Sequence, residues 1–324
     1  MENHNLLIVQ KLKKYFPVGG GLFRRPSGYV KAVDGVDLAV KKGETFGLVG
    51  ESGCGKTTLG RCILRLEEPT EGEIYFENED ILAYDRKALR QIRRDMQIIF
   101  QDPYSSLNPR KTVGQIVGEG FLVHRILSKR DRLERVKELM EIVGLHPEHT
   151  NRYPHEFSGG QRQRIGVARA LSLHPKLIIA DEPVSSLDVS IQAQILNLLV
   201  QLQRQFDLTY IFISHGLSVV RHISDRVAVM YLGRIVELAR SRSLFSRPLH
   251  PYTEALMSAV PLINPEKKRD RIILEGDVPS PIHPPSGCSF HPRCRHSEEI
   301  CRENIPVMEE FEENHWVRCY FPRK

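Results

Sequence analysis

A short apolar strand followed by a glycine-rich turn constrains this chain more than any other feature. Residues Thr45–Val49 are apolar and bounded by turn signals, as expected for a buried strand. The turn that follows, Gly50–Thr57, reads GESGCGKT and matches the pattern G-x-x-x-x-G-K-[ST]. Backbone N–H groups in such a turn can wrap phosphate oxygens, and the helix that begins there adds about half a positive charge. The strand context favours a phosphate-binding loop over a chance glycine-rich turn.

The side chains of this loop have distinct expected roles. Lys56 is expected to place a mobile cation on the β- and γ-phosphate oxygens, and Thr57 to offer its hydroxyl to Mg²⁺. Cys54 is expected to be a small filler in the loop without a catalytic role. The residues predicted to contact the nucleotide here are Gly50, Ser52, Gly53, Cys54, Gly55, Lys56, Thr57 and Thr58.

Two adjacent acids, Asp181 and Glu182, follow a second apolar strand at Leu177–Ala180. Acids at the end of a buried strand are costly unless they hold a cation or a proton. Asp181 is therefore predicted to join the Mg²⁺ shell through water, and Glu182 to take a proton from an attacking water as general base. The alternative is an acid pair at a helix N-terminus ahead of Pro183.

The first 245 residues have the pattern of a packed α/β unit. Another buried strand is expected at Tyr210–Ser214, and the apolar positions before it fall on one face of a helix over residues 189–205. A strand, a helix and a strand in this order predict a parallel pair with a right-handed crossover. A hairpin is expected from Val227–Tyr231 and Ile235–Leu238. Residues 86–169 are predicted to form a charged, mostly helical insertion.

Composition limits the broad class of protein. The chain has 324 residues, enough for about two domains, with 41% hydrophobic and 27% charged residues, as in an ordinary globular protein. A net charge of +6 fits a user of polyphosphates, a protein on an anionic membrane face or a nucleic-acid binder. No apolar run approaches the roughly 20 residues that span a bilayer, and Met1–Gln10 lacks a signal-peptide pattern. We therefore expect the chain to stay in the cytoplasm.

Four further segments resemble motifs of ATP-binding-cassette (ABC) ATPases. They are the signature motif at Phe157–Gln161 (FSGGQ), the Q-loop glutamine Gln101 in FQDP, the D-loop Ser186–Asp188 and the switch histidine His215. The resemblance implies an α/β P-loop NTPase of the ABC ATPase type, with a parallel core sheet, an antiparallel β subdomain and a helical subdomain. It also implies an ATPase that uses ATP and Mg²⁺.

The resemblance assigns roles to these residues as well. The implied contacts are Ser158, Gly159, Gly160 and Gln161 with the γ-phosphate bound by the opposite subunit, Asp188 with the dimer interface, Gln101 with Mg²⁺ and water, His215 with the γ-phosphate, and Tyr15 with adenine. Phe16 is the rival of Tyr15 for the adenine contact. The alternatives are structural: a helix cap at 158–161, another at 186–188, a satisfied histidine at 215 and core packing at Tyr15.

The sequence departs from the usual family pattern at two positions. Phe157 stands where the signature most often has leucine, a packing change that we expect to be tolerated. Gly216 follows His215 where an acid is common, so the support of the histidine loop is expected to differ.

Within the ABC ATPases, the chain is most similar to oligopeptide/dipeptide importer subunits, and segments such as FQDPYSSLNPRKTVGQI and HPYTEALMSAVP carry the likeness. It implies a peripheral subunit on the cytoplasmic membrane face that couples ATP hydrolysis to uptake of dipeptides or oligopeptides. The implied partners are membrane permease subunits, a similar ATPase subunit or a second copy, and, indirectly, an extracytoplasmic peptide-binding protein. Residues Pro103–Phe121 would meet the permease's coupling helices. A nucleic-acid-associated cassette is the alternative, disfavoured because basic and acidic residues are interspersed.

Composition changes after Arg247, where 11 of the 20 prolines lie. We therefore divide the chain into an ABC ATPase domain, 1–245, and an extension, 246–324, expected to be extended with a short helix. The extension holds four cysteines, Cys288, Cys294, Cys301 and Cys319. Their spacing is not that of a zinc ribbon, and a disulfide framework is not expected in a reducing cytosol. Spacing leaves open an iron–sulfur cluster, zinc or free thiols, and the resemblance favours a [4Fe-4S] cluster that staples the tail.

Overall fold

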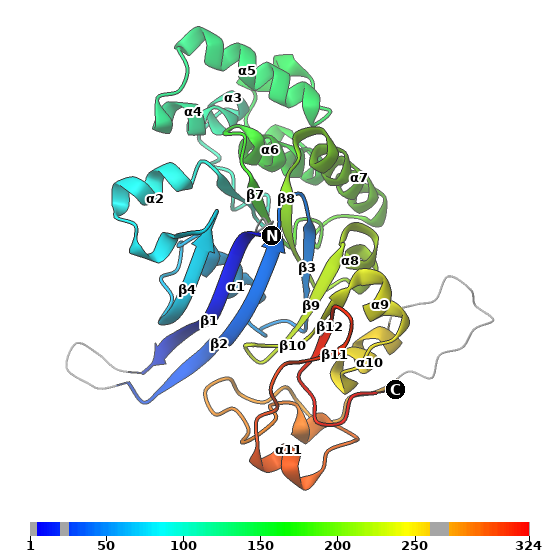
Figure 1. Cartoon of the computed structure of the whole chain (residues 1–324). Helices are drawn as coiled ribbons and strands as arrows, with labels where there is room; N and C mark the ends of the chain where they lie inside the picture. The colour runs from blue at the N-terminus through cyan, green and yellow to red at the C-terminus, as the bar shows by residue number, and fades with distance from the viewer. Residues whose placement is uncertain (1–4, 20–25, 260–271, 324) are drawn as a thin grey trace. The chain divides into compact units, whose positions relative to one another are not determined.

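The computed structural model describes residues 5–19, 26–259 and 272–323. Residues 1–4, 20–25, 260–271 and 324 lie outside these ranges. The chain forms two compact units (Figure 1). Residues 1–40, 45–82 and 214–324 make the first unit, and residues 41–44 and 83–213 make the second. In the described ranges, no helix is both long and apolar enough to cross a membrane.

The first unit contains an antiparallel β layer, as the fold class predicts. Its strand order is β2-β1-β4-β5, and β1 runs antiparallel to β4, which runs antiparallel to β5. The strands are β1 Asn5–Val18, β2 Gly28–Lys41, β4 Glu71–Phe76 and β5 Glu79–Asp80, followed by a 3₁₀ turn at Ile81–Ala83. Strand β1 contributes Leu6, Leu7, Val9 and Leu12 to the core, and its register with β4 shifts between Gln10 and Lys13.

The phosphate-loop strand also lies in the first unit. Strand β3 (Thr45–Val49) is wholly buried, as predicted, and pairs in parallel with β9 (Arg226–Tyr231). Strand β10 (Arg234–Arg240) returns antiparallel to β9, which confirms the predicted hairpin. The helices of this unit are α1 Lys56–Ile63, α8 Leu217–Ile223, α9 Ser241–Ser246, α10 Pro251–Ser258 and α11 Glu299–Glu303.

The C-terminal extension contains more regular structure than expected. The predicted short helix is α10, but the extension also forms two strands, β11 (Glu309–Glu312) and β12 (His315–Val317). Strand β12 pairs antiparallel with β10 and β11 pairs with β12, side by side in Figure 1. The expectation of an extended tail was therefore incomplete, because β12 forms by pairing with β10 and β11 by pairing with β12, and neither short strand carries an alternating apolar pattern long enough to predict it.

The second unit is built on three parallel strands. Their order is β8-β7-β6, with β6 Met96–Ile99, β7 Leu177–Asp181 and β8 Thr209–Ser214. The crossover helix between β7 and β8 is α7 (Val189–Phe206), which confirms the predicted strand–helix–strand unit. The other helices are α2 Arg86–Ile92, α3 Val113–Val117, α4 Glu119–His124, α5 Lys129–Ile142 and α6 Gly159–Leu171, with 3₁₀ turns at Pro147–Asn151 and Pro154–Glu156. Strand β6 interrupts the stretch that was expected to be mostly helical.

Candidate functional site

The loop between β3 and α1 is shaped by glycines. Gly55 has φ +107°, and a Cβ there would lie 1.9 Å from the carbonyl oxygen of Ala32. Only glycine fits this backbone, because L-residues avoid that conformation and the space is filled. Gly55 is the N-cap of α1, makes no side-chain capping bond, and no acid lies in the first turn of the helix. The positive end of α1 therefore opens onto the loop, as phosphate binding requires.

Lys56 is held within the loop itself. Its ammonium donates to the carbonyl oxygens of Gly50 at 2.8 Å and Glu51 at 3.0 Å, and the side chain is only 5% exposed. A buried ammonium with carbonyl partners is well placed to exchange them for phosphate oxygens. Cys54 is also buried, and burial raises the pKa of its thiol, so it stays protonated. This agrees with the predicted filler role.

Tyr15, the predicted adenine contact, is tied to the same loop by a chain of hydrogen bonds. Its hydroxyl donates to Asp34, which also accepts two bonds from Arg234. Although burial alone would raise the pKa of Asp34, the bonds from Tyr15 and Arg234 lower it. The Asp34 amide donates to the Gly233 carbonyl, and the Gly233 amide donates to the Cys54 carbonyl. Tyr15 is thereby fixed relative to residue 54.

In the second unit, the structure brings together two predicted site residues, Gln101 and Glu182. Strands β6 and β7 run parallel with Ile99 beside Ala180, so the residues two positions further on emerge at the same edge. The Gln101 amide donates to the Glu182 carboxylate at 3.0 Å. The Glu182 amide donates to the Ile213 carbonyl, and its φ of +47° turns the chain sharply after β7. The Gln101 amide therefore helps to orient the Glu182 carboxylate.

Asp181 is the last residue of β7 and is 4% exposed. A carboxylate so deeply buried at a strand end is expected to have a cation or hydrogen-bond partner. Asp181 and Glu182 therefore present two carboxylates in different surroundings, one buried and one half-exposed. Two such carboxylates could serve as a metal ligand and a general base, the roles predicted for them.

The predicted signature segment forms the start of helix α6. Ser158 is its N-cap and exchanges bonds with Gln161: the Gln161 amide donates to the Ser158 hydroxyl, and the Ser158 amide donates to the Gln161 side chain. The capping box shows that these two side chains cap the helix, and it leaves the amides of Gly159 and Gly160 as the donors at the helix start. The predicted contact with a partner's γ-phosphate stays a prediction. A Cβ on Gly160 would lie 2.5 Å from Ile191, so this glycine lets α6 approach α7.

The two departures from the family pattern are accommodated. Phe157 is 4% exposed and contacts His149 edge-on, with ring centroids 5.9 Å apart. Gly216 has φ −84°, and a Cβ there would meet only ordinary contacts. The backbone therefore does not require glycine after His215, which is exposed in the first unit. Asp188 is the N-cap position of α7, but its carboxylate makes no capping bond.

Two arginines that the sequence did not single out hold the segment after Gln101. Arg162 lies over the ring of Tyr104 at 3.8 Å, and Arg169 donates to the Ser106 carbonyl at 2.6 Å. Arg162 is buried in α6 together with Ile165, and Arg169 is half-buried. Charged residues at positions that helical periodicity places in the core are the signal that could have identified them.

Two known protein families match parts of this chain. The family described as "ABC transporter" matches residues 33–185, and the one described as "Oligopeptide/dipeptide transporter, C-terminal region" matches residues 236–301. The oligopeptide transport ATP-binding protein AppF of Bacillus subtilis (strain 168) is 57% identical over 318 residues, covering 97% of each chain. The chain belongs to the oligopeptide/dipeptide branch of ABC transporter ATP-binding proteins. The dipeptide transport ATP-binding protein DppF of Haemophilus influenzae is 51% identical, over 98% of this chain and 97% of that protein.

Solved structures agree with this family. The dimeric post-hydrolysis state of the ATP-binding cassette MJ0796 bound to ADP and Pi matches with a TM-score of 0.65 and 29% identity, over 73% of this chain and 99% of that one. CbiO1 from Clostridium perfringens matches with the same TM-score, over 75% of this chain. The protein is thus an ABC ATPase with the ABC ATPase fold, as the motifs predicted.

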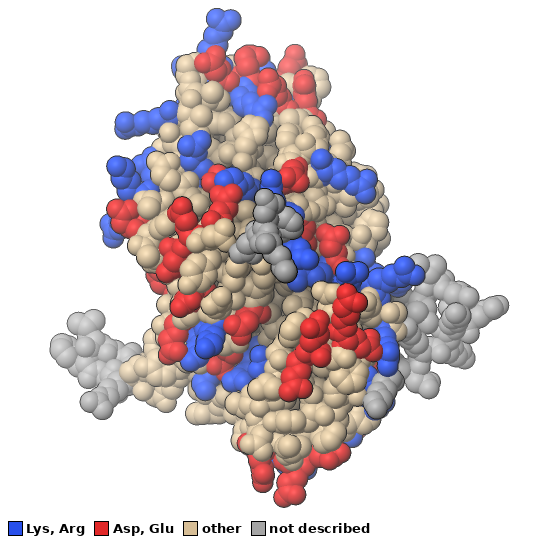
Figure 2. All heavy atoms as spheres, viewed as in Figure 1, with Lys and Arg blue, Asp and Glu red and all other residues tan. Residues whose placement is uncertain are grey.

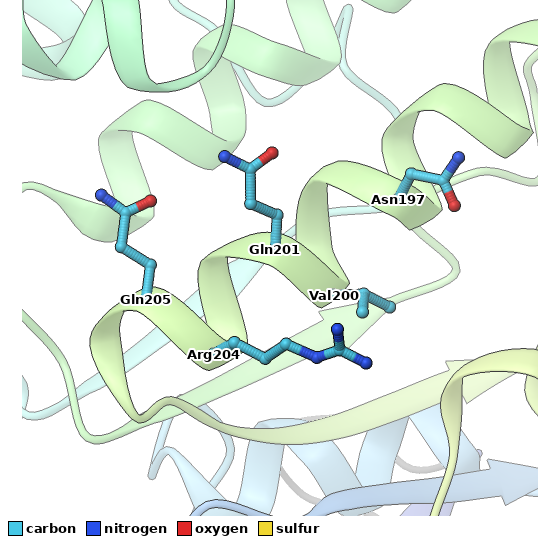
Figure 3. A pocket seen from close by; sticks show the side chains of 5 residues that line it. All are labelled: Asn197, Val200, Gln201, Arg204 and Gln205. Carbon is cyan, nitrogen blue, oxygen red and sulfur yellow. The ribbon is translucent and has the colours of Figure 1, made fainter.

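The surface of the ABC ATPase adds two observations. Figure 2 shows Lys and Arg intermixed with Asp and Glu on the face in view, without a continuous basic tract. A hollow of about 440 Å³ lies along the exposed face of α7 and is lined by Asn197, Val200, Gln201, Arg204 and Gln205 (Figure 3). None of the predicted site residues lines this hollow. Its open surface consists mainly of amide side chains and does not indicate a ligand or a reaction.

The four cysteines of the extension converge on one small void of about 10 Å³. All are free thiols, and burial raises the pKa of Cys288, Cys294 and Cys319, the last to about 12. Across the described parts of the chain, however, no group of three or more His, Cys, Asp or Glu side chains is placed to hold a metal ion. The predicted [4Fe-4S] cluster is therefore unsupported, although thiols are suitable donors for such a cluster.

Proposed function

We propose that this ABC ATPase couples ATP binding and hydrolysis to the uptake of dipeptides or oligopeptides through membrane permease subunits. The observation that carries the proposal is the second family match, at residues 236–301, together with identities above 50% to an oligopeptide and a dipeptide transport ATP-binding protein. The proposed location is the cytoplasmic face of the membrane. An extracytoplasmic peptide-binding protein would deliver the peptide to the permease.

The proposed nucleotide contacts follow the motifs. Residues Gly50–Thr58 bind the phosphates, with Lys56 on the β- and γ-oxygens. Tyr15 stacks on adenine, which the hydrogen bond to Asp34 supports by fixing the ring. The division 1–245 and 246–324 is kept as a functional one, since the first segment carries every nucleotide motif.

The hydrolytic step is assigned to the acids after β7. Glu182 takes the proton from the attacking water, and the Gln101 amide at 3.0 Å supports this role by orienting the carboxylate. Thr57, Asp181 and Gln101 are the proposed Mg²⁺-binding residues, and His215 contacts the γ-phosphate. When bound, Mg²⁺ would neutralise charge that develops on the phosphate oxygens.

Hydrolysis is proposed to take place in a head-to-tail dimer. Ser158–Gln161 of one subunit would face the γ-phosphate bound by the other, and Asp188 would lie at the interface. Dimeric structures among the solved relatives support this arrangement. The partner is a second copy or a similar ATPase subunit.

A groove in the second unit is the proposed docking site for the permease. It has a volume of about 970 Å³ and lies between α3 and α5. Its lining includes exposed Leu122 and Leu133 together with Lys111, Glu119 and Arg132. Apolar side chains ringed by charges suit an amphipathic helix, and the groove overlaps the segment Pro103–Phe121 that was expected to meet the coupling helices.

A metal staple in the extension remains part of the proposal, with a [4Fe-4S] cluster first and zinc as the alternative. Convergence of four cysteines on one void supports it, and ligation would require the thiols to rearrange. Anaerobically purified protein should be brown and contain about four irons per chain. Colourless protein with stoichiometric zinc would favour the alternative, and protein without either metal would exclude both.

The test of the transport function uses the assembled complex. Tagged protein purified from membranes should bring down integral permease subunits, and the complex in lipid vesicles should take up labelled dipeptides or oligopeptides when ATP is supplied. The Lys56→Ala complex should assemble but not transport. Recovery of nucleic acid without any permease would contradict the proposal and favour the alternative class.

A further inference from the structure

The second residue of the phosphate loop, Glu51, is held by the C-terminal extension. Arg293 donates to both carboxylate oxygens of Glu51, at 2.8 and 3.3 Å. The amide of Glu51 donates to the Tyr252 hydroxyl at 2.9 Å, and its carbonyl accepts from Lys56 at 3.0 Å. Side chain, amide and carbonyl of one loop residue are therefore all engaged, and two of the three partners come from the extension.

The ion pair is well shielded from solvent. The Arg293 side chain is 7% exposed and that of Glu51 is 28% exposed. Hydrogen bonding to Glu51 raises the pKa of Arg293, so the guanidinium stays charged. A two-pronged guanidinium–carboxylate pair fixes orientation as well as charge, and it is stronger when partly buried than on an open surface.

The partners of Glu51 are themselves anchored by an aromatic cluster. Phe290, three residues before Arg293, is 2% exposed and packs against Tyr231, Tyr252 and His250 with ring centroids 5.3 to 5.6 Å apart. Tyr252 is the second residue of α10, and His250 caps this helix by accepting from the Tyr252 amide. The Arg293 guanidinium and the Tyr252 hydroxyl therefore contact the loop from a segment that is held in place by this aromatic cluster.

We propose that Arg293 and Tyr252 are positioning residues for ATP binding, acting through Glu51. An uncompensated carboxylate in a loop that receives a triphosphate would repel it, and Arg293 cancels that charge. Tyr252 holds the Glu51 amide in place and thereby positions the backbone of Glu51. The Lys56 ammonium donates to the Glu51 carbonyl and must leave it to reach a phosphate oxygen. The inference rests on the proposed role of Gly50–Thr58 in binding ATP.

A contact that merely stabilises the fold would behave differently from one that cancels charge. In the Arg293→Ala variant the Glu51 carboxylate is left without its guanidinium, and ATP affinity should fall about tenfold, a typical cost for a lost charge-assisted bond. Adding Glu51→Gln to that variant removes the repelling charge, and should return the ATP affinity to within about threefold of the original protein. A purely structural clamp would not be rescued in this way.

The experiment measures ATP affinity, KM for ATP, kcat and thermal unfolding of the full chain. The variants are Arg293→Ala, Arg293→Lys, Arg293→Ala with Glu51→Gln, and Tyr252→Phe, with Arg302→Ala as a matched control from an exposed position in the same segment. We expect KM to rise in Arg293→Ala with kcat within about twofold, a smaller rise in Arg293→Lys, and no change in the control. Tyr252→Phe should weaken ATP binding about threefold without lowering the unfolding temperature.

Two results would overturn the inference. Arg293→Ala could bind ATP like the original protein, or the double variant could bind as weakly as Arg293→Ala. If Arg293→Ala does not fold, Arg293→Lys and Tyr252→Phe decide, and unchanged ATP affinity in both contradicts the inference. The Lys56→Ala variant distinguishes failure of this inference from failure of the proposed function. If Lys56→Ala keeps full ATP affinity, the assignment of Gly50–Thr58 as the phosphate loop is wrong. If Lys56→Ala loses ATP affinity but the Arg293 and Tyr252 variants do not, only the present inference fails.

Discussion

At the residue scale, two glycines of α6 stand in opposite environments. A Cβ on Gly160 would lie 2.5 Å from the Cγ2 of Ile191. This methyl group is on the β-branch of isoleucine, whose χ1 rotation is restricted in a helix. A Cβ on Gly166, in the middle of the same helix, would meet nothing within 4 Å. The same chemical change therefore has opposite expected effects within one helix.

Gly160→Ala should destabilise the protein by about 1–3 kcal/mol, because it overpacks the contact between α6 and α7. Gly166→Ala should instead stabilise it by about 0.5–1 kcal/mol, because alanine favours the helix and no neighbour is displaced. Denaturant unfolding of the two variants measures both effects. If Gly160→Ala is as stable as Gly166→Ala, the close contact between α6 and α7 does not require glycine at position 160.

Site residues could be predicted from sequence where a motif fixes the backbone. The loop at Gly50–Thr57 and the acids after β7 follow from a buried strand and a characteristic turn. The hydrogen bond between Gln101 and Glu182 could not be predicted, because it depends on β6, which lies in a stretch with a helical, charged pattern. The pair Arg293–Glu51 spans 242 positions, and no local pattern reports a contact of that range.

At the element scale, one buried carboxylate joins β10 to the extension. Glu237, fully buried in β10, accepts from the amides of Leu249 and His250 ahead of α10. It is also 2.7 Å from His315 of β12. A strand, a helix start and the terminal hairpin therefore share a single acceptor.

Glu237→Ala should lower the free energy of unfolding by about 3–5 kcal/mol, since it leaves several buried donors without an acceptor. Glu237→Gln keeps one acceptor oxygen and should cost less. Chemical denaturation gives both values. If Glu237→Ala is as stable as the original protein, Glu237 does not hold the β11–β12 hairpin against β10.

The same contact explains which strands could be predicted. β3, β7 and β8 are buried apolar runs, so their own residues predict them. β11 and β12, with the sequences EEFE and HWV, are too short to predict themselves; β12 depends on β10 and Glu237, and β11 depends on β12. Tertiary contacts therefore decide these two strands, and composition alone predicted only an extended tail.

At the scale of the whole molecule, the proposed hydrolysis needs two chains per working site. ATP should convert a Glu182→Gln variant into a dimer, because the nucleotide stays bound between subunits when hydrolysis is blocked. Light scattering with and without ATP measures the change. A further Ser158→Glu substitution should prevent dimer formation while ATP binding persists, since a carboxylate would then face the triphosphate. Dimers in that double variant would contradict the assigned role of the α6 N-terminus.

The central claim is that Glu182 is the general base of an ATPase whose phosphates are held by Gly50–Thr58. Steady-state ATP hydrolysis by Glu182→Gln tests it most directly, with ATP affinity measured on the same sample. We expect that ATP still binds to Glu182→Gln and that its turnover falls by about 10²–10⁴-fold, the usual contribution of a general base. Hydrolysis at the normal rate by Glu182→Gln would contradict it.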